Sequence, residues 1–138
     1  MAKEKNNNSH FLTKAEAIVM QNLDDSSFSS TDLASQLGIS RYQLYRKLSK
    51  YTSKSGSSYI RSIRLREAKR MLSELEESVS SIGYMVGFSS PTYFNRTFKE
   101  EYGVTPGDVR NGKKARKKRS LWKSVQLVFM KNSRKVLR

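Results

Sequence analysis

Two short segments of this 138-residue chain place serine, arginine and large apolar residues at the same spacing. The first is "SRYQLYRKL", which begins at Ser40, and the second is "SPTYFNRTF", which begins at Ser90. In each segment, apolar residues stand four and eight positions after the serine, and an arginine stands six positions after it. Arginine contacts phosphate and forms paired hydrogen bonds with guanine. The repeated arginine therefore suggests guanine or phosphate contact at two equivalent positions.

The two segments divide into core positions and outward positions. Leu44 and Leu48 in the first, and Phe94 and Phe98 in the second, recur at helical spacing and are assigned to the core. The candidates for contact with DNA bases are Arg41, Tyr42, Tyr45, Arg46, Thr92, Tyr93, Asn95 and Arg96. The candidates for contact with phosphates are Ser40, Lys47, Lys50, Arg61, Ser90 and Lys99.

These assignments compete with interpretations that need no nucleic acid. Arg46 and Arg96 could be solvated or form intrahelical ion pairs, which is the default for surface charges. Tyr42 could pack against the core or a linker, and the lysines could belong to a general basic surface. Helical spacing alone explains several other aromatics, which we assign to the core: Tyr59, Phe88, Phe94 and Phe98.

Other chemistries lack the residues they need. The chain has no cysteine, and His10 is its one histidine, so a disulfide framework, a zinc site and a nucleophile–histidine triad are not expected. No acid–base pair or phosphate loop stands out either. We expect no enzyme and no catalytic, cofactor or metal residues. No apolar run approaches the roughly 20 residues of a membrane helix, and no signal peptide is recognisable, so an intracellular protein is expected.

The formal net charge of +15 is unevenly distributed. Residues 111–138 carry 11 basic residues and no acidic one, so much of the excess lies in a C-terminal tail. Residues 41–70 hold ten basic residues against the single Glu67, whereas residues 71–90 are acidic. The body of the chain therefore has a positive region of its own, as expected for contact with a polyanion.

Helical periodicity dominates the chain and predicts an all-α fold of about seven helices. Ser29 and Gly38 bound one short helix, while Ser40 and Gln43 form the pattern of a capping box. The predicted helices cover about 12–23, the segment between Ser29 and Gly38, 41–51, 58–75, 79–86, 91–102 and a last short turn after Thr105-Pro106.

An internal repeat organises these helices. "LASQLGIS" at 33–40 and "IGYMVGFS" at 82–89 share the order apolar, small, two spacers, apolar, glycine, apolar, serine. A small residue allows two helices to approach, and a glycine supplies the sharp turn between them. Each copy thus predicts a helix-turn-helix unit whose second helix is free to enter a major groove.

The same residues resemble a known family. "GFSSPTYFNRTFKEEYGVTPGDVR" is similar to the second helix-turn-helix of AraC/XylS transcription regulators, and "DLASQLGISRYQLYRKL" with "YIRSIRLREAKRML" resembles their first unit and linker helix. The resemblance covers about residues 11–110. It implies two recognition helices in successive major grooves of double-stranded DNA, transcriptional control, usually activation through RNA polymerase, and similarity to the output domains of hybrid two-component sensors.

The resulting organisation has five parts: a disordered start at 1–10, a first helix-turn-helix subdomain at 11–56, a linker helix at 57–76, a second subdomain at 77–110 and a disordered basic tail at 111–138. Two recognition helices in one chain predict a monomer. Gly83 stands where the family commonly has alanine, which we expect to loosen its helix. The family's usual ligand-binding or sensor domain is absent from the sequence.

The tail supports an alternative function. Its "KKARKKR" run would raise non-specific affinity for nucleic acid, and "LWKSVQLVFM" puts apolar residues near one helical face, as in a surface-bound membrane helix. The alternative is therefore a peripheral membrane or non-specific nucleic-acid-binding protein that acts through its tail. Deleting residues 111–138 separates the two interpretations, since specific duplex binding should survive and tail-driven association should not.

Overall fold

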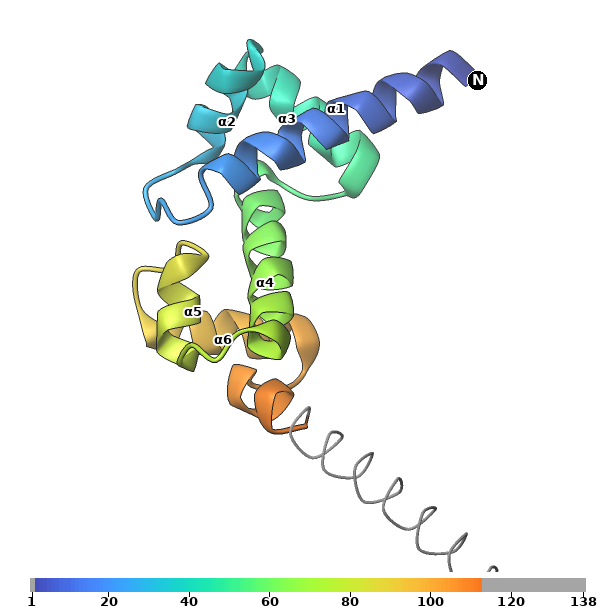
Figure 1. Cartoon of the computed structure of the whole chain (residues 1–138). Helices are drawn as coiled ribbons and strands as arrows, with labels where there is room; N and C mark the ends of the chain where they lie inside the picture. The colour runs from blue at the N-terminus through green and yellow to red at the C-terminus, as the bar shows by residue number, and fades with distance from the viewer. Residues whose placement is uncertain (1, 113–138) are drawn as a thin grey trace, which may run out of the picture.

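The computed structural model describes residues 2–112, which form two small helical units at the two ends of one long helix (Figure 1). Residues 106–112 are also helical, and no strand occurs in the described part. The labelled helices are α1 (Ala2–Gln21), α2 (Ser30–Leu37), α3 (Arg41–Thr52), α4 (Gly56–Glu74), α5 (Val79–Met85) and α6 (Pro91–Tyr102). The predicted all-α fold, with two helix-turn-helix subdomains and a long linker helix, is confirmed. Most of the basic tail, residues 113–138, lies outside the described residues.

Serine caps begin every helix from α2 to α6. In each case the serine hydroxyl accepts a hydrogen bond from a backbone N–H of the first turn: Ser29, Ser40, Ser55, Ser78 and Ser90. Such a cap satisfies an N–H group that has no partner inside the helix, and its loss typically costs about 1 kcal/mol. The predicted capping box of Ser40 and Gln43 is present, and α2 has a second box formed with Asp32.

The first helix begins much earlier than predicted. The sequence predicted a disordered segment over 1–10, whereas α1 is helical from Ala2. Phe11, Ala15 and Val19 are buried and anchor the C-terminal part of α1 in the core. Once this part is helical, adding residues at its start requires no new nucleation, which is why a polar, asparagine-rich segment extends it.

The two units are built in parallel on α4. In the first, α2 and α3 pack on each other and α1 packs on α2, while in the second α5 packs on α6. Helix α4 contacts α1, α2 and α3 at one end and α5 at the other (Figure 1). The relative placement of α3 and α6 therefore depends on how each unit sits on α4.

Aromatic rings form the core of the second unit. Phe94 and Phe98 are fully buried, and ring centroids 4.8–5.9 Å apart connect Phe88, Phe94, Phe98 and Tyr102 in a chain. Phe88 and Tyr59 are 4% and 7% exposed, so the prediction that these aromatics belong to the core is confirmed.

Gly83 has a different role from the one the sequence suggested. We expected it to loosen its helix, but it is buried in α5 beneath the ring of Phe94. A Cβ atom at Gly83 would lie 2.7 Å from Cδ2 of Phe94, which real Cβ atoms essentially never show, and 3.1 Å from its Cγ, which is a tight contact. The missing side chain is what allows α6 to place this ring against α5.

We expect Gly83→Ala to lower the melting temperature, although alanine is the better helix former by about 1 kcal/mol. Overpacking a tight core typically costs about 1–3 kcal/mol, and Phe94 is fully buried among other core residues. Thermal unfolding measures the change, with Ser80→Ala on the exposed side of α5 as control. In a double-mutant cycle, Phe94→Leu should recover part of the loss. A higher melting temperature for Gly83→Ala would show that the core accommodates the added Cβ atom next to the ring of Phe94.

Candidate nucleic-acid interface

The outward face of α3 carries the four residues predicted for base contact in the first unit. Arg41, Tyr42, Tyr45 and Arg46 are all exposed, with Tyr42 at 67% and Tyr45 at 59%. Leu44 and Leu48 on the same helix are buried. Single exposed apolar residues are common on protein surfaces, but two tyrosines three residues apart lie on the same face of a helix and expose their rings together. The exposed pair makes this face a candidate surface for contact with another molecule.

Helix α6 repeats the arrangement in the second unit. Thr92, Tyr93, Asn95 and Arg96 are exposed, although Tyr93 is only 36% exposed because its ring contacts Phe88 at a centroid distance of 5.6 Å. The structure thus divides both helices into core and outward faces as the spacing indicated. Contact of these eight side chains with DNA bases stays a prediction.

In both helices the repeated arginine lies over a tyrosine ring. The Cζ atom of Arg46 is 5.9 Å from the ring centroid of Tyr42, and that of Arg96 is 5.5 Å from Tyr93. The tyrosines occupy different positions of the repeat, so comparing the two copies did not reveal the pairs. The signal was the spacing of four and three residues on a helix, which brings side chains together. Such a contact restrains the guanidinium and leaves its N–H edge available.

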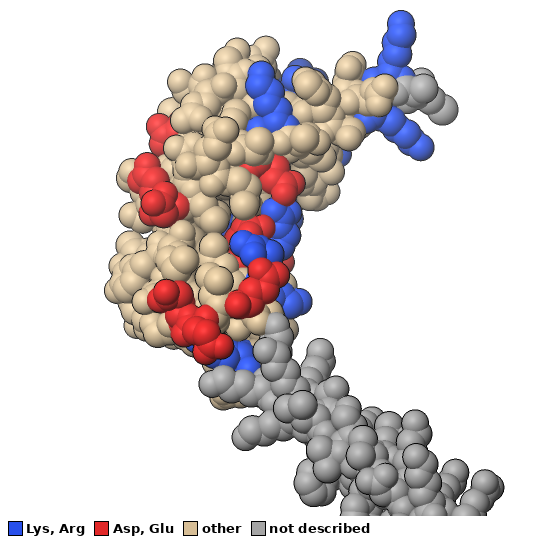
Figure 2. All heavy atoms as spheres, in the orientation of Figure 1, with Lys and Arg blue, Asp and Glu red and all other residues tan. Residues whose placement is uncertain are grey.

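Arg46 of α3 and Arg96 of α6 differ from the arginines of α4 that form ion pairs with glutamates. Among residues 2–112, the ion pairs involve Arg66 and Arg70, whose partners are Glu16, Glu67 and Glu74. Figure 2 shows acidic and basic side chains interleaved on one face of the molecule. Arg46 and Arg96 take part in no ion pair of the described part, so the alternative of an intrahelical ion pair does not apply. Their charge is available to a polyanion.

The candidates for phosphate contact fall into distinct environments. Lys47 and Lys50 on α3 are exposed, with their ammonium groups 5.0 Å and 5.6 Å from the rings of Phe11 and Tyr51. Lys99 is exposed in the last turn of α6. Arg61 is half-buried on α4 and donates a hydrogen bond of 3.2 Å to the Ser58 hydroxyl.

Ser40 and Ser90 have a structural role, whereas their contact with phosphate stays a prediction. Each hydroxyl accepts a 3.1 Å hydrogen bond from a backbone N–H of its own helix, that of Gln43 or Tyr93. A hydroxyl also carries one proton of its own, which remains free to donate to a phosphate oxygen. Capping and phosphate contact are therefore compatible.

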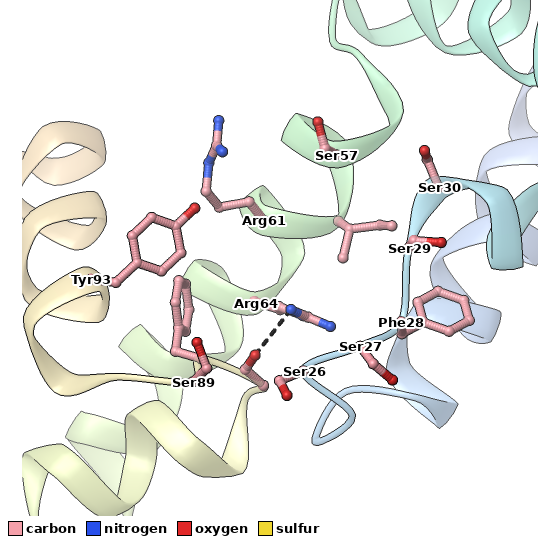
Figure 3. Close-up of a pocket in the computed structure, with 13 residues that line it drawn as sticks. Ser26, Ser27, Phe28, Ser29, Ser30, Ser57, Arg61, Arg64, Ser89 and Tyr93 are labelled. Atoms are coloured by element: carbon pink, nitrogen blue, oxygen red, sulfur yellow. Dashed lines mark hydrogen bonds between the residues drawn. The ribbon is translucent and has the colours of Figure 1, made fainter.

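A cleft of about 350 Å³ separates the two units on one side of α4 (Figure 3). Serine hydroxyls line much of it, from the segment before α2, the start of α4 and the turn before α6: Ser26, Ser27, Ser29, Ser30, Ser57 and Ser89. Arg61, Arg64 and Tyr93 complete the polar lining. Arg61 and Tyr93 were singled out from the sequence as candidates for contact with DNA, whereas Arg64 and the serines were not, because no local motif marks them for such contact.

Arg64 is held at the bottom of this cleft by backbone carbonyls. Its two terminal nitrogens donate hydrogen bonds to the Gly87 oxygen at 3.1 Å and to the Asp25 oxygen at 2.7 Å. Burial lowers the pKa of Arg64 from its ordinary value, and the nearby Asp25 carboxylate opposes this shift. Hydrogen bonds from Ser27 lower the pKa of Asp25, which keeps that carboxylate ionised.

Other kinds of site find no support in the described residues. Within residues 2–112, no group of three or more histidine, cysteine, aspartate and glutamate side chains could hold a metal ion. Over the same range, no helix is both long and apolar enough to cross a membrane.

Comparison with protein families shows which known family this fold and sequence match. A protein-family model described as a helix-turn-helix domain matches residues 33–112. This match is more than half of the chain and includes both α3 and α6. The chain belongs to the AraC-type helix-turn-helix family. A second model, described as a bacterial regulatory protein of the Fis family, matches residues 14–51, which contain the first unit alone.

Two curated relatives show how much of a longer protein such a chain covers. Histidine kinase P4 from Formosa agariphila is 34% identical over 100 residues, which are 72% of this chain and 7% of that protein. Transcriptional activator RhrA from Rhizobium meliloti is 43% identical over 97 residues, which are 67% of this chain and 30% of that protein. The AraC-type chain thus spans less than a third of either relative.

Solved structures of the family share the fold. A transcriptional regulator from Chromobacterium violaceum, described as one of the AraC-type DNA-binding domain-containing proteins, is 31% identical, with a TM-score of 0.69 over 74% of this chain and 90% of that one. The DNA-binding domain of AdpA, solved in complex with a target DNA, is 25% identical, with a TM-score of 0.69 over 76% of this chain and 94% of that one. The chain is thus a DNA-binding domain of a family of transcription regulators rather than of enzymes.

Two substitutions separate the roles of Ser40. Ser40→Ala should lower the free energy of unfolding by about 1 kcal/mol, because the cap of α3 is lost. Ser40→Asp keeps a good capping group, so its melting temperature should stay near that of the wild type. Its added negative charge should nevertheless weaken duplex binding if a phosphate lies nearby. If Ser40→Asp binds the duplex with wild-type affinity, the predicted phosphate contact is wrong and Ser40 acts only as a helix cap.

Proposed function

We propose that this domain regulates transcription by inserting α3 and α6 into successive major grooves on one face of double-stranded DNA. The observation that carries the proposal is the repeated exposed face. In both units an arginine that has no ion pair within residues 2–112 lies over a tyrosine, beside buried apolar residues that fix the helix on its own unit. One chain therefore supplies two similar surfaces for base contact.

The proposed geometry requires no dimer. Recognition helices that lie in successive grooves on one face of the duplex are separated by about one helical turn, near 34 Å or roughly 10 bp. A symmetric dimer normally supplies the second helix, whereas here α4 connects both helices within one chain. A single chain should therefore bind a site of two unlike halves.

The side chains divide into two proposed groups. Arg46 and Arg96 pair with guanine through two hydrogen bonds, and Asn95 has the chemistry to pair with adenine. Arg41, Tyr42, Tyr45, Thr92 and Tyr93 complete the base-contacting faces. The phosphate contacts come from Ser40, Lys47, Lys50, Arg61, Ser90 and Lys99, which position the domain without reading its sequence.

The wider role of the protein is proposed from its relatives. RhrA is named as a transcriptional activator, and the P4 relative is named as a histidine kinase. We infer that this domain acts as an activator that contacts RNA polymerase, and that it belongs to the output side of a two-component system. Its place would then be the nucleoid in the bacterial cytoplasm.

The paired arginines test base contact directly. Arg46→Ala should relax base preference in one half of a selected site, and Arg96→Ala should relax it in the other half. Each paired guanine contact is worth about 1–3 kcal/mol of discrimination. Binding to a panel of single-base duplex variants measures the preference, with thermal melting as a check on folding. Lys50→Ala is the matched control, because loss of a phosphate contact should lower affinity almost uniformly across the panel.

The same panel can contradict the assignment. Unchanged base preference in both arginine variants would remove Arg46 and Arg96 from base contact. A uniform loss of affinity, like that expected for Lys50→Ala, would make them phosphate contacts. A large fall in melting temperature would make them structural.

A further inference from the structure

The two helix-turn-helix units meet directly at one side chain of the linker helix. Arg64 lies near the middle of α4, and its guanidinium reaches outward to both units at once (Figure 3). One hydrogen bond goes to Asp25 in the loop between α1 and α2, and the other goes to Gly87 in the turn between α5 and α6. These partners are 39 residues before and 23 residues after Arg64 in the chain.

The backbones of the two units also touch beside Arg64. A Cβ atom at Gly87 would lie 2.4 Å from the Leu23 carbonyl oxygen and 2.8 Å from Cζ of Arg64. Gly87 also has a φ of 93°, a conformation that side chains rarely adopt. Glycine is thus needed for the turn of the second unit and for its close approach to the loop of the first.

Elsewhere the units are connected through α4 rather than to each other. The larger helix–helix contacts run within a unit or between a unit and α4. The hydroxyl-lined cleft separates the units next to the Arg64 junction. The two units can therefore change their relative orientation if α4 bends. The hydrogen bonds of Arg64 to both units lie where they would oppose this change.

We propose that Arg64 is a positioning residue that sets the separation and relative rotation of α3 and α6, and thereby the spacing between the two half-sites on DNA. This inference rests on the proposed reading of two grooves by one chain. An arginine suits the role because two nitrogens of its rigid fork reach two carbonyls together. Its Nε is buried without a hydrogen-bond partner among the described residues, so the junction holds the guanidinium by its two ends.

A stiff junction has a measurable consequence for binding. When one unit is bound, the second binds from an effective concentration that is highest at the spacing the junction favours. One inserted base pair moves the second half-site by about 3.4 Å and rotates it by roughly 35°. If the two units are held rigidly, contacts in one half-site are lost at such a site. If their connection is flexible, the units adapt to the new spacing, and the affinity differs little between spacings.

The first experiment measures the distance between the two units in the absence of DNA. The chain has no cysteine, so Gln36→Cys on α2 and Glu100→Cys on α6 place two spin labels at exposed positions without background. Pulsed electron paramagnetic resonance gives the distribution of distances between the labels. It should be narrow with Arg64 in place, broader in Arg64→Met and intermediate in Arg64→Lys, which has one donor group at its end.

Arg70→Met is the matched control for this measurement. Arg70 is on the same helix, but its bonds go to Glu67 and Glu74 of α4 itself. Its removal should leave the distance distribution unchanged. If Arg64→Met does not fold, Arg64→Lys decides the matter. An unchanged distribution in the folded Arg64 variant would overturn the inference.

The second experiment measures half-site spacing. Duplexes with none, one or two base pairs inserted between the half-sites are bound to the same variants. For the wild type, one inserted base pair should reduce affinity about tenfold or more, because contacts in one half are lost. For Arg64→Met the penalty should fall to about threefold or less, with weaker binding at the best spacing.

The two experiments separate this inference from the proposed function. If the wild type shows no preference for spacing, the reading of two grooves fails, while the distance distribution still decides the role of Arg64. If the wild type prefers one spacing and Arg64→Met keeps the same penalty for insertions, two-groove reading stands and the role of Arg64 in spacing is wrong.

Discussion

The burial of α4 against both helix-turn-helix units is the constraint on which the rest of the structure depends. Its buried residues are Tyr59, Ile60, Ile63, Leu65, Glu67, Ala68 and Leu72, and they do not form a single stripe. A helix that is buried on several sides packs against several neighbours at once. Removing this helix would leave two units that are each too small to bury a core of their own. Stability and the placement of the recognition helices therefore have the same origin.

The distribution of charge follows from the same arrangement. Where α4 emerges from the core, the buried Glu67 carboxylate is bonded to Arg66 and Arg70, so these charges neutralise each other. Arg46 of α3 and Arg96 of α6 instead lie over tyrosine rings, away from any carboxylate partner in the described residues. An exposed cation that no carboxylate neutralises adds its full charge to the potential around this surface, and that potential attracts a polyanion. The pairing pattern thus distinguishes structural cations from those proposed to bind DNA, which net charge alone does not.

Local signals made much of this fold predictable. Serine caps, the glycine turns and the spacing of Leu44, Leu48, Phe94 and Phe98 act within a few residues, and they located the helices and their buried faces. The features that were missed depend on distant contacts. Gly83 is explained by a ring on another helix, the early start of α1 by an anchor further along the helix, and Arg64 by two carbonyls far away in the sequence.

The central claim is that one chain reads two neighbouring major grooves. Selection of bound duplexes from a random pool, followed by footprinting of the best sequence, tests this claim most directly. The account predicts two protected major-groove patches about 10 bp apart on the same face of the DNA, with one chain bound to each duplex. A single protected patch, or a palindromic site that two chains must occupy together, would contradict it.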